Sequence, residues 1–312
     1  MGKIECAGGV ILLYSYRRPE FTDQAIQRLL EWENLHCIYV SIDGLRAAAD
    51  NREKNWRKQT IGIVERWASQ TSRVIPMIWE NNDGLTAHGI RAFNEIMPKY
   101  GHLISLEEDN LISNDGLDFL HNHVCTTKEP MAATSYSKYQ HPNMSHGQRA
   151  TWFPEQWGTS FNLAFYNEFL KIWKSKEIDP LQFQKVLYPL FGKNKKVDRA
   201  IAHWVSEFKS AIYHESWGDA IFAYTATKIG TPYAAPWNTY TEDLGFQDPR
   251  GLNQRNRIDV IAYKHKPKFV KFNEGVFCLK CDGRLFGIYK STFIKKFIRK
   301  IRWEFYKRRS TI

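Results

Sequence analysis

The sequence predicts an α/β fold whose mostly parallel sheet is covered by helices on both faces. Short apolar runs alternate with helical stretches over residues 8–106, the pattern of β–α–β units joined by right-handed crossovers. The apolar runs are continuous rather than alternating, as expected of parallel strands buried on both faces. Hydrophobic residues form 43% of the 312 residues, which is enough for a large core.

The first half of the chain supplies four predicted strands and three predicted helices. The strands cover residues 8–14, 37–42, 73–79 and 102–106. The helices cover residues 21–32, 47–70 and 85–99, where apolar residues recur at helical spacing. Turns that contain Asp43-Gly44 and Asn81–Gly84 separate these elements.

The second half is less regular and richer in aromatic residues. Helices are predicted over residues 163–173, 200–208 and 220–228, and residues 176–198 look like an insertion. The length favours one large domain over residues 1–288, with halves at about 1–125 and 126–288. Residues 289–312 are set apart as a basic tail.

Polar residues follow the predicted strands where each one ends. After the first strand, which ends at Tyr14, come Arg17 and Arg18; Asp43 follows the second, Asn82 and Gly84 the third, and Glu107, Glu108 and Asp109 the fourth. In open α/β sheets, ligands bind outside the carboxyl ends of the strands. We therefore expect these residues to line one crevice.

The acidic run Glu107-Glu108-Asp109 indicates a cation site. Three consecutive carboxylates repel one another unless positive charge lies between them. Mg²⁺ and Mn²⁺ prefer oxygen ligands and keep water or phosphate oxygens in their remaining positions. The alternative is a solvated acidic turn.

Several segments, in this order, resemble nucleotide-sugar glycosyltransferases with the GT-A fold, a Rossmann-like α/β fold. They are Tyr16-Arg-Arg-Pro19, Ser41-Ile-Asp-Gly44, Asn82-Asp-Gly-Leu85, residues 106–120, Trp157-Gly158, Trp217-Gly-Asp219 and Asp243-Leu-Gly-Phe246. The most similar group is N-acetylglucosaminyltransferase I-like, together with bacterial polysaccharide and lipopolysaccharide glycosyltransferases. The resemblance spans residues 8–250.

The resemblance implies roles for the strand-end residues. Asp43 would bind the nucleotide base, and Asp109 would link Mn²⁺ or Mg²⁺ to the donor diphosphate. Glu107 and Glu108 would face the sugar and the ribose. Tyr14, Arg17, Arg18, Asn82 and Gly84 complete the predicted nucleotide-sugar site. Asp43 could instead cap a helix or turn, and either arginine could face solvent.

The resemblance also implies a catalytic base and an acceptor site. Asp219 would take the proton from the acceptor hydroxyl. Gly218 replaces the first acid of the family's W-D-D pattern, so Glu215 remains a rival base. Trp157 and Trp217, with Trp152 and Trp237, would stack on sugar rings, although core packing is the alternative for each tryptophan.

The implied function is metal-dependent transfer of a sugar from a nucleotide donor to a polysaccharide or lipopolysaccharide acceptor, with inversion. The expected donor is a UDP-sugar. A retaining enzyme of the same fold is the nearest alternative. The other alternative is a non-catalytic module that binds nucleic acid or glycan. Such a module would give the three acids of the run Glu107-Glu108-Asp109 no role. We therefore expect no nucleic-acid partner.

The net charge of +11 is concentrated in the tail. Residues 290–312 contain nine basic side chains and one acidic side chain, so they carry +8 of it. Phe293, Phe297, Ile301 and Phe305 lie on one side of a predicted helix, which is typical of an interfacial helix on an anionic membrane. A helix docked on its own domain and a nucleic-acid patch are the alternatives.

The expected location is the cytosolic face of a membrane, as a peripheral protein. No apolar run approaches the roughly 18 residues that a membrane-spanning helix needs. The first residues, Met1–Cys6, lack the pattern of a signal peptide.

Overall fold

The computed structural model describes residues 8–136, 148–152, 158–214, 218–236 and 239–243. Its strands are β1 (Gly9–Ser15), β2 (Leu35–Ile42), β3 (Val74–Ile78), β4 (His102–Glu107), β5 (Asn110–Ile112), β6 (Ala132–Thr134), β7 (Gln148–Thr151), β8 (Thr159–Asn162), β9 (Tyr233–Pro236) and β10 (Thr241–Asp243). Its helices are α1 (Pro19–Leu30), α2 (Asn51–Gln70), α3 (Leu85–Tyr100), α4 (Asn114–Cys125), α5 (Leu163–Ser175), α6 (Pro180–Phe191), α7 (Lys195–His214) and α8 (Asp219–Ile229).

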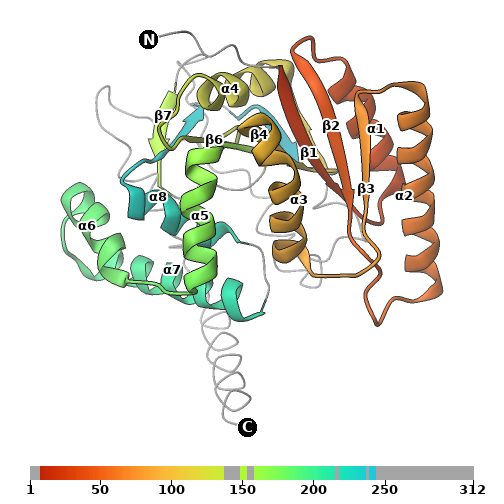
Figure 1. Ribbon diagram of the computed structural model, residues 1–312. Coiled ribbons are helices and arrows are strands. Elements are labelled where there is room, and N and C mark those ends of the chain that lie inside the picture. Colours follow the sequence, from red (N-terminus) through yellow and green to blue (C-terminus); the bar gives the residue numbers. More distant parts are fainter. Residues whose placement is uncertain (1–7, 137–147, 153–157, 215–217, 237–238, 244–312) are drawn as a thin grey trace.

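Eight strands form one sheet in the order β3-β2-β1-β4-β8-β6-β9-β7 (Figure 1). The pairs among β3, β2, β1 and β4 are parallel, as is β6 with β9. Strands β8 and β7 run antiparallel to their neighbours. A second, two-stranded sheet pairs β5 with β10. The predicted α/β class with a mostly parallel sheet is confirmed.

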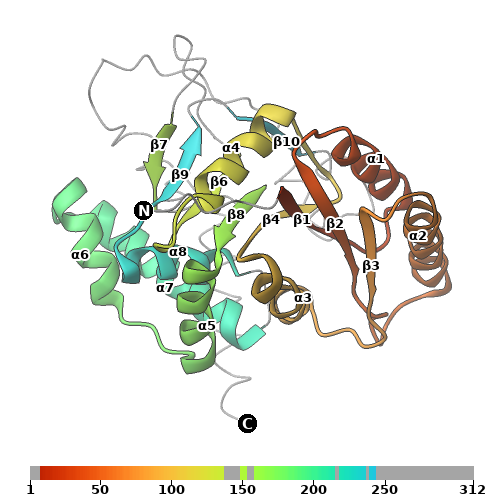
Figure 2. The ribbon, with the colours of Figure 1, turned by 45° about the horizontal axis from the view of Figure 1, so that its top comes forward.

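Helices cover both faces of the sheet, as Figure 2 shows for α1 and α2 on one side and α3 and α5 on the other. Alternate residues of a strand point to opposite faces. In β1, Val10 and Leu12 accordingly join a core with α3, α5 and α8. Ile11 and Leu13 join a second core with α1, α2 and α4.

The stretch that the sequence marks as an insertion belongs to the core. Residues 180–191 form α6, whose Phe183 and Leu187 are fully buried, and α7 begins at Lys195. Helix α6 packs on α7 and α8. Helix α7 is also much longer than the predicted 200–208, because the hydrophobic pattern continues past Phe208 to Ala211 and Ile212.

The two halves of the chain share one sheet. Strand β8 comes from the second half, yet it pairs with β4 through Ile104 opposite Ser160. The predicted helices over residues 163–173 and 220–228 are confirmed as α5 and α8. None of the helices in the described ranges is long and apolar enough to cross a membrane.

The strand order fixes where a ligand can bind. The chain runs from β1 to β2 and β3 on one side, and then returns to place β4 on the other side of β1. This reversal between β1 and β4 is a topological switch point, the place in open α/β sheets where ligands bind outside the carboxyl ends of the strands.

Candidate functional site

The loops that follow β1 and β4 meet at the switch point. Tyr14 and Glu107 lie opposite each other in the parallel register. The Glu108 amide donates to the Tyr14 carbonyl oxygen at 3.0 Å, which fixes the acidic turn against the end of β1. The turn therefore starts from a rigid support rather than from a free loop.

Arg18 supplies the positive charge that faces the acidic turn. Its Nη1 pairs with Oδ2 of Asp109 and lies 3.5 Å from Oε1 of Glu108. The Arg18 guanidinium also lies 5.9 Å from the centre of the Phe21 ring. The side chains of Arg18 and Asp109 are only 12% and 7% exposed, so little water screens this pair.

Asn110 adds an oxygen beside Asp109. Its Nδ2 donates to Oδ1 of Asp109 at 3.2 Å, and the residue is only 4% exposed. Its amide oxygen has no hydrogen-bond partner among the described residues. An unpartnered buried oxygen costs free energy unless a ligand or water satisfies it.

Asp43 is the centre of a second polar cluster, at the ends of β2 and β3. It is 7% exposed. Its carboxylate accepts from the Gly44 amide at 2.9 Å, from Nδ2 of Asn82 at 2.9 Å and from the Asp83 amide at 3.3 Å. Burial raises the pKa of Asp43, against the lowering effect of the hydrogen bonds from the Gly44 and Asp83 amides. The contacts also match the turn role that the sequence left open.

Arg91 completes this cluster from α3. Its guanidinium lies 3.8 Å from the centre of the Trp79 ring, 2.5 Å from Asp83 and 3.7 Å from Asp43. Stacking on tryptophan holds a guanidinium flat while leaving its edge for hydrogen bonds. Its Nε has no hydrogen-bond partner in the described part of the chain.

Two glycines allow the backbone to form this cluster. A Cβ on Gly44 would lie 2.2 Å from the Asn81 carbonyl carbon, so only glycine permits this close approach of the two turns. Gly84 has φ of 78°, a region that other residues avoid, and it leads directly into α3. The predicted Asn82 and Gly84 thus shape the site next to Asp43.

Glu53 forms a third cluster between the loops after β1 and β2. Its carboxylate accepts from the Tyr16 hydroxyl at 2.8 Å and from Nε of Arg46 at 2.8 Å, and Arg17 lies 3.7 Å away. The hydrogen bonds from Arg46 lower the pKa of Glu53, although its burial opposes this. The predicted Arg17 is therefore paired rather than facing solvent.

Asp219 is the first residue of α8, where the helix dipole favours a carboxylate. Gly218, which precedes it, lies against the first turn of α3, because an added Cβ would be 3.8 Å from Cγ2 of Thr86. The start of α8 is therefore beside the helix that follows the Asn82–Gly84 turn.

The donor set at the acidic turn has the chemistry that a hard divalent cation requires. The carboxylates of Asp109 and Glu108 and the amide oxygen of Asn110 are oxygen donors, which Mg²⁺ and Mn²⁺ prefer. No group of three or more His, Cys, Asp or Glu side chains within the described ranges is arranged as a complete metal site. Substrate and water oxygens would have to supply the remaining ligands.

The other predicted site residues fall into two groups. Tyr14 is 3% exposed and packs edge-on against His88 and Phe93 in the core, and its backbone carbonyl holds the acidic turn. Trp152 packs against the core. The rest lie outside the described residues: Glu215, Trp157, Trp217, Trp237, Phe293, Phe297, Ile301 and Phe305.

Sequence reasoning missed Arg46, Glu53 and Arg91. Glu53 sits in a helix of mostly charged residues, where its burial leaves no mark in the hydrophobic pattern. Arg46 follows Asp43-Gly44 closely, so its position just after a strand end was a usable signal. Arg91 lies two helical turns after Gly84, on the same face of the helix as the turn that precedes it.

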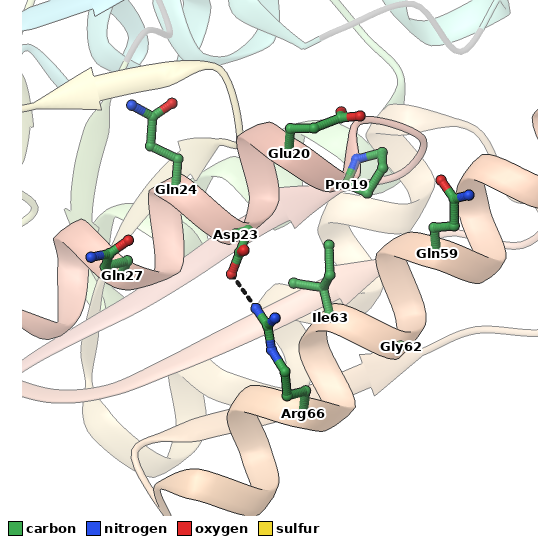
Figure 3. Close-up of a pocket in the computed structure, with 9 residues that line it drawn as sticks. All are labelled: Pro19, Glu20, Asp23, Gln24, Gln27, Gln59, Gly62, Ile63 and Arg66. Carbon is green, nitrogen blue, oxygen red and sulfur yellow. Dashed lines mark hydrogen bonds and ion pairs between the residues drawn. The ribbon is translucent and has the colours of Figure 1, made fainter.

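A surface groove of about 580 Å³ runs between α1 and α2, and its lining contains none of the charged residues of these three clusters (Figure 3). Its walls include Gln24 and Gln27 from α1 and Gln59 from α2, and Arg66 pairs with Asp23 across it at 2.5 Å. None of the strand-end residues predicted from the sequence lines this groove.

Comparisons with known proteins give distant structural similarity. No protein-family model and no curated protein matches the sequence. The chain is similar to the mannosyltransferase PcManGT from Pyrobaculum calidifontis in complex with GDP-Man and Mn²⁺, at 10% identity and a TM-score of 0.40, over 72% of each chain. It is also similar to apo WbbM, a bifunctional glycosyltransferase, at 8% identity and a TM-score of 0.32. That match covers 56% of this chain and 36% of the other.

Proposed function

We propose that this chain is a glycosyltransferase of the GT-A type that uses a nucleotide-sugar donor. One observation carries the proposal. Arg18, Glu108 and Asp109 meet at the switch point, next to a second cluster around Asp43. Charged groups of both signs at the carboxyl ends of four parallel strands suit a ligand that combines a phosphate group with hydroxyl-rich and aromatic parts.

The site residues divide between the parts of such a donor. Asp43, with Asn82 beside it, would bind the nucleotide base, and Arg17 and Arg18 would bind phosphate oxygens. A divalent cation held by Asp109, with help from Glu108 or Glu107, would stabilise negative charge on the departing diphosphate. We propose UDP as the nucleotide and Mn²⁺ or Mg²⁺ as the cation.

Asp219 is the proposed general base. A carboxylate that removes the proton from the acceptor hydroxyl makes this oxygen a better nucleophile as it attacks the anomeric carbon. Its place at the start of α8 gives the carboxylate a favourable interaction with the helix dipole. The proposed transfer inverts the anomeric carbon, and a polysaccharide or lipopolysaccharide is the proposed acceptor.

The test is a transfer and hydrolysis assay over a panel of UDP-sugars and GDP-sugars with Mn²⁺. We expect Asp109→Asn and Asp219→Asn each to lower the rate at least about a hundredfold, in line with the loss of a general base or of charge stabilisation. Asp115→Asn, at an exposed position in the first turn of α4, is the matched control. The proposal fails if folded Asp109→Asn protein keeps full activity.

Product stereochemistry decides the mechanism. NMR of the anomeric carbon in the first product should show inversion, and a product with retained configuration would assign the chain to the retaining class. Tight, salt-sensitive binding of RNA or DNA without any nucleotide-sugar binding would instead favour a binding module.

The basic tail is proposed to hold the enzyme on the cytosolic face of an anionic membrane. We expect the full chain to float with liposomes that contain anionic lipid, and the tail variant Phe297→Asp/Ile301→Asp to remain in solution. Equal flotation of the two proteins would contradict this proposal.

A further inference from the structure

We propose that Arg18 is a built-in counter-ion that competes with the divalent cation for Asp109. The inference rests on the proposed function and adds an order of events to it. Without ligand, the Arg18 guanidinium neutralises the acidic turn. When the cation binds, it takes over Asp109 and displaces Arg18, which then turns to the donor phosphates.

The first step of the argument is the geometry of the pair. Nη1 of Arg18 contacts Oδ2 of Asp109, while Oδ1 of Asp109 accepts from Asn110 at 3.2 Å. Both oxygens of this carboxylate are thus engaged by side chains of the protein. A cation can take the lone pair of Oδ2 that faces Arg18 only after the guanidinium has moved, because a guanidinium and a metal ion cannot share one lone-pair direction.

The second step concerns charge. Arg18 carries one positive charge and faces two carboxylates, Asp109 and, at 3.5 Å, Glu108. A divalent cation bound to Asp109 would lie close to this guanidinium. Arg18 and that cation would repel each other strongly in this nearly buried place, where screening by water is weak.

The third step is the unpartnered oxygen. Asn110 is 4% exposed, and its Oδ1 has no hydrogen-bond partner among the described residues, although its Nδ2 touches Asp109. A cation next to Asp109 would give this oxygen a partner, which favours exchange of the guanidinium for a metal.

The exchange has a purpose for the donor. A guanidinium released from a carboxylate is well suited to bind phosphate oxygens with two parallel hydrogen bonds. Cation and diphosphate should then bind cooperatively, since the first releases the arginine that the second uses. This linkage predicts that removal of the Arg18 charge strengthens the binding of the cation alone. The same change should weaken the cooperativity between the cation and the diphosphate.

The test is a titration of the full chain with Mn²⁺ alone, read from the electron paramagnetic resonance of unbound Mn²⁺. We expect Arg18→Gln to bind Mn²⁺ about tenfold more tightly than the wild type, as the competitor is gone. Arg18→Lys, which keeps the charge, should stay close to the wild type. Arg66→Gln, an arginine paired with exposed Asp23, controls for net charge.

The second measurement repeats the titration with inorganic pyrophosphate or UDP present. In the wild type, either anion should tighten Mn²⁺ binding, and in Arg18→Gln this gain should be several-fold smaller. Asp109→Asn should abolish the tight Mn²⁺ site of Arg18→Gln, and circular dichroism should show that each variant is folded.

The outcomes separate the inference from the proposed function. Equal or weaker Mn²⁺ binding by Arg18→Gln overturns the inference, even if the wild type transfers sugar. Absence of Mn²⁺ binding in both proteins overturns it as well. Tighter binding by Arg18→Gln that depends on Asp109 supports it, even if no nucleotide sugar in the panel is a donor.

Discussion

At the scale of single residues, the site depends on charged side chains that are buried but paired. Asp43 and Asp109 could be predicted, because each follows an apolar strand at the edge where ligands bind. Glu53 could not be predicted, since an acidic residue in a charged helix reads as solvent-exposed. Only its three partners from two separate loops show that it is buried. Sequence thus indicates a position in the crevice but not which charges meet there.

Glu53→Gln should lower the free energy of unfolding by about 2 kcal/mol, because Arg46 and Arg17 lose their shared counter-charge. Urea denaturation at pH 7 measures the change. Glu65→Gln on the same helix, at an exposed position, should change the free energy by less than about 0.5 kcal/mol. A Glu53→Gln protein as stable as the wild type would contradict the assigned pairing.

His88 should make the protein sensitive to acid. Burial lowers its pKa to about 4, while an unfolded histidine has a pKa of about 6.5. The folded state resists protonation of His88. The free energy of unfolding is therefore highest above pH 6.5 and decreases as the pH falls from 6.5 towards 4. This group alone should cost about 2 kcal/mol between pH 7 and pH 5.

Urea denaturation at these two pH values tests that expectation. His88→Gln should show a loss of stability that is about 2 kcal/mol smaller than in the wild type, because glutamine does not titrate. Substitution of His36, which is exposed at the start of β2, provides the control and should keep the wild-type difference. Identical pH dependence in His88→Gln and the wild type would show that His88 is not responsible.

At the scale of elements, long periodic segments were predictable and short ones were not. The four strands and three helices of the first half are confirmed with small shifts of their ends. Strands β5, β6 and β10 have three residues each, too short for a periodic signal. Helix α2 begins at Asn51 rather than residue 47, because Asp50 caps it by accepting from the Glu53 amide.

Asn162 should be the most costly helix cap to remove. Its Oδ1 accepts from the Phe165 amide of α5 at 3.0 Å and from the Met131 amide at 3.1 Å, and its Nδ2 donates to the Glu129 carbonyl at 2.7 Å. Asn162→Ala should therefore lower the free energy of unfolding by about 3 kcal/mol.

Ser113→Ala is the matched comparison for this prediction. Ser113 caps α4 through one hydrogen bond, from the Gly116 amide at 3.2 Å, so its loss should cost about 1 kcal/mol. Thermal or urea denaturation ranks the two variants. Equal costs would show that the contacts of Asn162 outside its own helix add no stability.

At the scale of the whole molecule, the two halves should unfold together. They share the sheet, because β4 of the first half pairs with β8 of the second. They also share a core, in which the ring centres of Phe93 and Phe161 are 5.0 Å apart. Urea unfolding followed by circular dichroism and by tryptophan fluorescence should therefore give coincident transitions.

A substitution in the second half tests this coupling. Phe222 stacks on Phe169 at 4.4 Å and is 3% exposed, so Phe222→Ala should lower the free energy of unfolding by about 3–5 kcal/mol. Both probes should shift by the same amount. Two separate transitions, with only one of them shifted, would indicate halves that fold independently.

The central position of β1 has a consequence for biosynthesis. This strand leaves the ribosome before both of its partners, with side chains that are buried in the folded protein and two hydrogen-bonding edges. Its partner β4 emerges roughly 90 residues later, so one edge stays open during much of translation. Such an unpaired edge can form hydrogen bonds with a strand of another chain. We therefore expect the nascent chain to need a chaperone until β4 has paired with β1. Slower translation after that point should not improve folding further.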